Sequence, residues 1–95
     1  MNAYIEQIDY TQSHIQQWKS YDFDQALELA KIREKQAINN NILGPLHGIP
    51  VGIKDIIHVE GFKTEFNSKA FKEVDTSKYD SEIVLALKSA GAIIL

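Results

Sequence analysis

The chain has 95 residues, of which 44% are hydrophobic and 24% charged, and its formal net charge is −3. This composition is that of one small globular domain, and without a block of basic residues it gives no reason to expect nucleic-acid binding. The absence of cysteine excludes disulfides, thiol catalysis and cysteine-ligated metals, and it suits a cytoplasmic protein.

Membrane association is not expected. No apolar run approaches the roughly 18 residues that a membrane-spanning helix needs. The first ten residues carry Glu6 and Asp9 but no basic residue, so they do not form a secretory signal.

Two helices are predicted at the start of the chain. Residues 3–17 form the first, because apolar side chains recur there at helical spacing: Tyr4, Ile5, Ile8 and Ile15. Asp22 predicts the start of a second helix over residues 22–39, because Gln25 follows at the spacing of a capping box. Asn39 to Asn41 predict its end, because asparagine competes for backbone hydrogen bonds.

Two strands and a third helix are predicted in the second half. Residues 50–59 read as a strand that begins at Pro50 and is apolar on both faces, which is typical of a sheet covered on both sides in an α/β fold. Asp80 predicts the N-cap of a helix over residues 80–90, and Gly91 its end. Residues 92–95 begin a second buried strand.

The segment over residues 62–79 is less regular. Phe62, Phe66 and Phe71 are expected to anchor a loop, and Ser68 to Phe71 to form a single helical turn.

Lys54 stands inside an apolar, strand-like run that a Gly- and Pro-rich segment enters. Burying an ammonium group costs several kcal/mol unless the group is neutralised or paired, so a lysine in such a place is a candidate for chemistry. The alternative is an ordinary strand lysine that faces solvent or pairs with an acid, and periodicity alone favours this alternative.

Metal and phosphate sites are not predicted. The chain has three histidines without metal-ligand spacing, and three glycines that lack the arrangement of a phosphate-binding loop: His14, His47 and His58, and Gly44, Gly48 and Gly52. No cofactor is therefore expected. Gly52 is expected to allow close backbone packing instead.

The last residues, Ala92 to Leu95, form an apolar strand with no polar exit. Such an end would leave an open sheet edge and exposed apolar surface. We therefore expect the chain to be a truncated N-terminal fragment of a larger α/β enzyme.

Three segments together resemble the amidase signature family: GPLHGIPVGIKD at residues 44–55, Ser68-Lys69-Ala70, and a capped helix followed by GAIIL. The resemblance covers roughly residues 5–95. It implies the N-terminal portion of an α/β/α layered fold with a mixed sheet, of which residues 1–95 supply about three helices and two strands.

The resemblance also implies a Ser–cis-Ser–Lys mechanism for hydrolysing the C–N bond of a small-molecule amide. The base of that triad falls on Lys54, whose pKa would have to drop from about 10.4 toward neutrality. Ile53 and Ile56 would supply the desolvation, provided that the rest of the enzyme covers them. In the family both serines lie downstream of residue 95. The fragment is therefore expected to be inactive alone, and no substrate-binding residue is assigned.

Three further residues are expected to have structural roles. Asp55 should point away from Lys54 by strand alternation and cap or pair elsewhere, and His47 and Ser68 are expected to be structural. The family's usual asparagine two residues after the lysine is Ile56 here. Its usual Thr-Thr-Ala-Gly-Ser is replaced by Thr64-Glu65-Phe66-Asn67-Ser68, which leaves the substrate open.

Two alternatives remain at this point. The chain could be a fragment of the A subunit of the glutamyl-tRNA amidotransferase, in which the same lysine would serve glutamine hydrolysis beside protein partners and tRNA. It could also be a non-catalytic remnant that self-associates through its exposed sheet edge.

Overall fold

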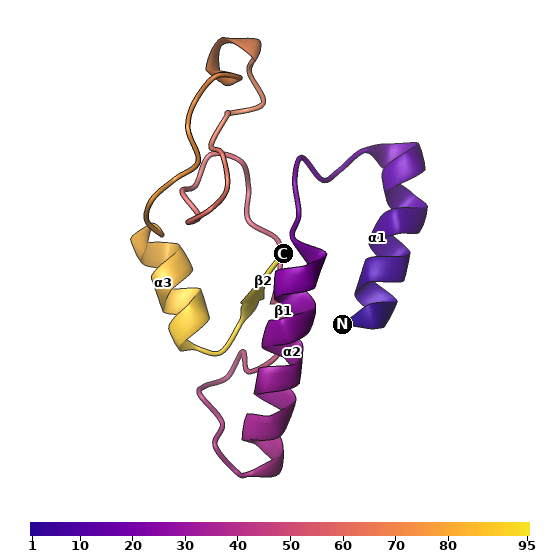
Figure 1. The fold of residues 1–95 in the computed structure, drawn as a ribbon, viewed down its shortest axis with the longest axis vertical. Helices are drawn as coiled ribbons and strands as arrows, with labels where there is room; N and C mark the ends of the chain where they lie inside the picture. The colour runs from indigo at the N-terminus through magenta and orange to yellow at the C-terminus, as the bar shows by residue number, and fades with distance from the viewer.

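Two short parallel strands separate two layers of helix in the computed structural model, which describes residues 1–95. The helices are α1 (Asn2–Ile15), α2 (Phe23–Ile38) and α3 (Glu82–Ser89), with one 3₁₀ turn, η1 (Lys69–Phe71). The strands are β1 (Pro50–Val51) and β2 (Ile93–Ile94). Figure 1 shows α3 on one side of the strand pair, with α2 and then α1 on the other. The predicted α/β layering is confirmed.

The strand pair explains why the sequence is apolar on both sides of its strands. Pro50 pairs with Ile93 and Val51 with Ile94 in parallel register, and α3 lies in the connection between them. Successive residues of a strand face opposite sides. Accordingly, Ile93 and Leu95 pack with Ile8 and Ala26 of α1 and α2.

The other face of β2 meets α3. Ile94 packs there with Val84 of α3 and with Val59, which follows the first strand. Phe62 lies against the same group, as expected of a loop anchor. The other two phenylalanines expected to anchor this loop, Phe66 and Phe71, are 50% and 43% exposed, and their ring centroids lie 5.2 Å apart.

Local capping signals place two helix ends and the 3₁₀ turn correctly. The carboxylate of Asp22 accepts a hydrogen bond from the N–H of Gln25 at 2.9 Å, so Asp22 is the N-cap of α2. This helix ends at Ile38, where the asparagine run begins. The expected single turn is η1, and Ser68 caps it by accepting from the N–H of Ala70 at 3.3 Å.

The strand expected over residues 50–59 is wrong in length, because β1 ends at Val51. The carbonyl of Lys54 accepts hydrogen bonds from the N–H groups of Ile56 and Ile57, at 2.7 and 3.1 Å. These bonds close a turn, and a turn cannot continue a strand ladder. The alternation expected for residues 52–59 therefore does not apply. β2 is likewise shorter than expected, at Ile93–Ile94.

The prediction that Asp80 caps α3 is wrong, because Ser81 is the N-cap residue. The Asp80 carboxylate, only 6% exposed, instead accepts from the N–H of Glu60 at 2.9 Å and from Lys88 at 2.5 Å. Burial raises the pKa of Asp80, but the hydrogen bond from Lys88, that from Glu60 and the charge of Lys88 together lower it by more. The pKa of Asp80 is held below its ordinary value of 3.8.

The turn into β2 is fastened to α2 and to the loop before β1. The carbonyl of Gly91 accepts from the N–H of Gly48 at 2.9 Å and from Nε of Arg33 at 3.2 Å. His47 completes the contact: Nδ1 accepts from the N–H of Leu43 at 3.1 Å, so Nε2 carries the proton and donates to the Arg33 carbonyl at 2.9 Å. The structural role expected for His47 is confirmed.

Gly91 is required at this junction for two reasons. Its φ is +97°, in the region that side chains rarely adopt, and a Cβ there would lie 2.6 Å from the Cα of His47. Gly91 follows the C-cap residue of α3, as predicted from the sequence.

We expect Gly91→Ala to lower the free energy of unfolding by about 3 kcal/mol, because it adds a backbone clash to the cost of a positive φ. Gly61→Ala is the matched control, since Gly61 has φ +86° with open space around its Cβ position. It should cost only about 1 kcal/mol. Urea denaturation of both variants measures the difference, and equal losses would contradict the close packing.

Asp80 should make stability depend on pH. Its lowered pKa means that the ionised group stabilises the fold above its unfolded pKa of about 3.9, and that this contribution is lost as pH falls through the lower folded pKa. Asp80→Asn should therefore lower the free energy of unfolding by about 1–2 kcal/mol at pH 7, a value reduced because Lys88 is partly exposed. The loss should become progressively smaller below about pH 4.

The control for this titration is Glu28→Gln. Hydrogen bonding and charge from Lys31 lower the pKa of Glu28 too, but this pair is fully solvated. Its substitution should leave stability nearly unchanged at every pH. A pH-independent cost for Asp80→Asn would disprove the role of its charge.

Candidate functional site

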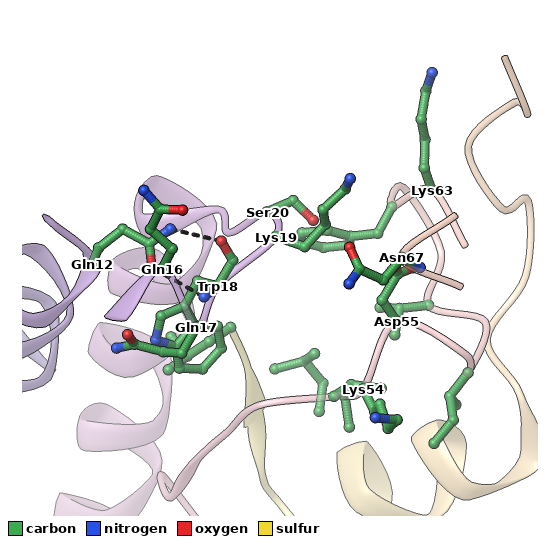
Figure 2. A pocket seen from close by; sticks show the side chains of 16 residues that line it. Gln12, Gln16, Gln17, Trp18, Lys19, Ser20, Lys54, Asp55, Lys63 and Asn67 are labelled. Carbon is green, nitrogen blue, oxygen red and sulfur yellow. Dashed lines mark hydrogen bonds between the residues drawn. The ribbon is translucent and has the colours of Figure 1, made fainter. Parts of the chain in front are cut away.

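A cavity of about 640 Å³ lies between the α1–α2 connector and the loop that follows β1. Figure 2 shows the two walls facing each other. Gln12 of α1 and connector residues 16–20 form one wall, loop residues between Ile53 and Asn67 form the other, and Ile94 and Leu95 complete the lining. The cavity therefore brings together segments that are far apart in the sequence.

Trp18 builds the connector wall. The side-chain amide of Gln12 donates to the Trp18 carbonyl at 2.7 Å and accepts from the Trp18 backbone N–H at 3.0 Å, so one side chain binds both backbone polar groups of Trp18. The indole ring lies against Gly52, where a Cβ would be only 2.7 Å from ring atom Cη2. The close packing expected at Gly52 is therefore confirmed.

Lys54 lies on the loop wall, three residues after β1 ends. Its side chain is exposed, and the ion pairs of the structure are formed by other residues. The neighbouring Ile56, named above as a source of desolvation, is itself 49% exposed. Lys54 thus lines the cavity with an exposed side chain that has no ion-pair partner. The cover on which the expected desolvation depends does not come from residues 1–95.

Asp55 points away from Lys54, as predicted, although a turn and not a strand produces this result (Figure 2). Its Oδ1 accepts from the N–H of Glu65 at 2.7 Å, and its Oδ2 accepts from the N–H of Asn67 at 3.1 Å. The Asp55 carbonyl also accepts from the N–H of Phe66 at 3.0 Å. Three consecutive N–H groups thus converge on one residue.

An ion pair joins the connector to the loop. Nζ of Lys19, which lines the cavity, lies 3.5 Å from Oε2 of Glu65, which does not. Sequence reasoning did not find this pair, nor the wall built by Gln12 and Trp18. No local pattern could have revealed them, because each contact depends on how distant segments fold together.

A nucleophile for Lys54 is not assembled here. Ser20 is the one hydroxyl side chain among the lining residues, and no hydrogen bond joins it to Lys54. Ser68 is used as the cap of η1, in the structural role predicted for it.

The three histidines have separate partners. His14 contacts the Ser13 hydroxyl at 2.8 Å, His58 contacts the Thr64 hydroxyl at 3.1 Å, and His47 bonds to backbone groups. The structure contains no group of three or more His, Cys, Asp or Glu residues that could hold a metal ion. None of its helices is long and apolar enough to cross a membrane.

The layered fold and the lysine-bearing loop define an α/β protein with a cavity whose lining includes Lys54. The family model described as Amidase matches residues 1–95, and the chain belongs to this family. The predicted family is therefore confirmed.

Relatives of known name agree with this assignment. The chain is 32% identical over 93 residues to the glutamyl-tRNA(Gln) amidotransferase A subunit from Moorella thermoacetica, with 98% of this chain and 19% of the relative covered. It is 30% identical over 95 residues to AmiB2 of Mycobacterium tuberculosis, which carries the name of an amidase, with 100% and 20% covered. The chain thus spans about a fifth of the length of these relatives.

A solved structure shares the same arrangement. It is described as a vestigial protein complex that reveals the evolutionary origins of an s-triazine catabolic enzyme. The TM-score is 0.91 at 26% identity, with 99% of this chain and 21% of that chain covered. The same layered arrangement therefore occurs within a longer chain.

Proposed function

We propose that this chain supplies Lys54 as the general base of an amide C–N hydrolase. The observation that carries the proposal is the unpaired Lys54 amine on the wall of a 640 Å³ cavity, in a chain that belongs to the amidase family. Two serines beyond residue 95 would complete a Ser–cis-Ser–Lys triad.

General-base catalysis by a lysine requires that the cavity be shielded from water. A lysine accepts a proton only in its neutral form, and removing water favours that form. A serine hydroxyl is a weak nucleophile until a positioned base takes its proton. Because Lys54 is exposed in residues 1–95, further protein must cover this cavity before Lys54 can act as a base.

The substrate proposed is a small-molecule amide. Asn67 lines the same cavity as Lys54, and it lies in the segment that departs from the family's usual Thr-Thr-Ala-Gly-Ser. The other departure, Ile56, is two residues from Lys54. These two positions are therefore where substrate preference is expected to differ from that of relatives.

The test is a chimera in which this chain replaces the matching N-terminal fifth of AmiB2. We expect the chimera to hydrolyse simple amides and Lys54→Ala to lower kcat by at least about 10³-fold, since a serine without its base loses most of its reactivity. Lys78→Ala is the control, because Lys78 lies outside the cavity. An active Lys54→Ala chimera would refute the assignment. The 95-residue chain alone should show no hydrolysis.

A second candidate is a role as part of an amidotransferase A subunit. Relatives with that name include the protein of Fusobacterium nucleatum, which is 35% identical over 95 residues. In this case glutamine would be the amide, and partner subunits and tRNA would be required.

Self-association is the third candidate. Helix α3 buries Val84 but leaves Ile83 and Leu85 more than half exposed, at 55% and 52%. A helix that is apolar beyond its core-facing side is typical of one that is covered by further protein. A second copy of the chain could supply that cover.

Light scattering of the purified chain, alone and co-expressed with the other amidotransferase subunits, separates these two candidates. A stable complex with those subunits would support the amidotransferase role. A dimer that forms alone and is lost in Leu85→Gln would support self-association. A monomer in both preparations would count against both.

A further inference from the structure

The position of Lys54 has no explanation in the strand pair. β1 ends at Val51, so the ladder of parallel hydrogen bonds does not reach the lysine. The turn bonds accepted by the Lys54 carbonyl shape the chain after it, and the lysine side chain itself has no hydrogen-bond or ion-pair partner. Another contact must therefore hold this part of the loop.

Asp55 provides that contact. Its carboxylate and carbonyl together accept the N–H groups of three consecutive residues, Glu65 to Asn67. Hydrogen bonds to an ionised acceptor are stronger than those between neutral groups. With both its side chain and its carbonyl engaged, Asp55 has little freedom to rotate. The peptide that joins it to Lys54 is bounded by this fixed residue, and its carbonyl accepts from Ile56 and Ile57.

The segment that Asp55 holds is strained. Phe66 and Asn67 have φ values of 54° and 50°, so two consecutive non-glycine residues adopt the left-handed conformation. Asparagine tolerates this conformation, but for a bulky residue such as phenylalanine it is a genuine outlier. Burial does not compensate for it, because Phe66 is 50% exposed. The three converging hydrogen bonds stabilise the strained turn, together with the bond from the N–H of Ser68 to the Glu65 carbonyl at 2.9 Å and the contact of Phe66 with Phe71.

The strained turn also reaches the opposite wall. Glu65, whose N–H donates to Asp55, pairs through its side chain with Lys19 of the connector. Asn67, the other N–H donor to the carboxylate, lines the cavity itself. Asp55 is thus the one residue that joins the Lys54 turn, the 65–67 turn and, through Glu65, the connector.

We propose that Asp55 is a positioning residue that fixes the backbone of Lys54 by binding the strained turn at residues 65–67. Its carboxylate points away from the lysine, so it acts through the backbone and not through an ion pair. Only the catalytic consequence rests on the proposed function. The geometric part concerns residues 1–95 alone.

The test compares Asp55→Asn with Asp75→Asn in the 95-residue chain. Asp75 is exposed and lies outside the cavity, so its substitution removes the same charge without the contact. In Asp55→Asn, we expect the N–H groups of Glu65 and Asn67 to exchange with solvent at least about ten-fold faster. The Lys54 backbone order parameter should fall from about 0.85 to below about 0.6. Asp75→Asn should change neither.

A double variant keeps the test decisive if Asp55→Asn unfolds. Phe66→Gly removes the strain, so Asp55→Asn/Phe66→Gly should fold, and Lys54 should still be mobile in it. An order parameter for Lys54 that stays high in either folded variant would overturn the proposal. Asp55 would then stabilise only the turn at residues 65–67.

The AmiB2 chimera separates this inference from the proposed function. Asp55→Asn should lower kcat by at least about ten-fold with little change in KM, because the lysine is misplaced in the transition state. Unchanged kcat, in a chimera that Lys54→Ala inactivates, would overturn the positioning role alone. Activity that survives Lys54→Ala would instead overturn the proposed function.

Discussion

The parallel pairing of β1 with β2 is the constraint on which the other contacts depend. Because successive residues of β2 face opposite sides, Ile93 belongs to the group that includes α1 and α2, and Ile94 to the group that includes α3. A shift of one residue in the pairing would exchange these sides and place each side chain against the wrong helix. The register thus sets the layers, and the layers set the two walls of the cavity.

The cavity is a product of loops more than of regular structure. β1 contributes the direction in which the chain leaves the sheet, but Lys54 lies beyond its end and depends on the turn around Asp55. The facing wall is likewise a connector, held by the paired hydrogen bonds between Gln12 and Trp18. Such a site can be repositioned by small changes in loop sequence while the sheet stays the same. This is consistent with the variety of activities named among its relatives.

Much of the fold follows from short-range signals. Asp22 with Gln25, the asparagine run and Gly91 each mark a helix end, because capping involves residues within one turn of each other. The apolar residues on both faces of the predicted strands likewise indicate a sheet covered on both sides, because this pattern too is read from neighbouring residues. The length of β1 does not follow, since a strand continues only where a partner supplies hydrogen bonds. Asp80 illustrates the same limit: its position suggests a cap, but its partners Glu60 and Lys88 come from the fold.

The candidate site also has a part that the sequence predicts and a part that it does not. The motif around Lys54 singles out this residue, and the structure places it at a cavity. Its surroundings could not be predicted, because the pair of Lys19 with Glu65 and the contact of Trp18 with Gly52 each join distant segments. The departures at residues 64–68 are visible in the sequence, but the left-handed turn that they form is not.

The junction at Gly91 has a consequence for how the chain folds. Its carbonyl accepts hydrogen bonds from Arg33 and from Gly48, so α2, the entry to β1 and the entry to β2 meet at one peptide group. Parallel strands joined by a long crossover form slowly, because a large loop must close before any pairing is gained. The hydrogen bonds at Gly91 hold the starts of both strands close together, which reduces the conformational search before the strands pair. Once the turn at Gly91 has bound to α2, only a local rearrangement is needed to bring Pro50 beside Ile93. The β1–β2 pair is therefore expected to form after the turn at Gly91 has bound to α2.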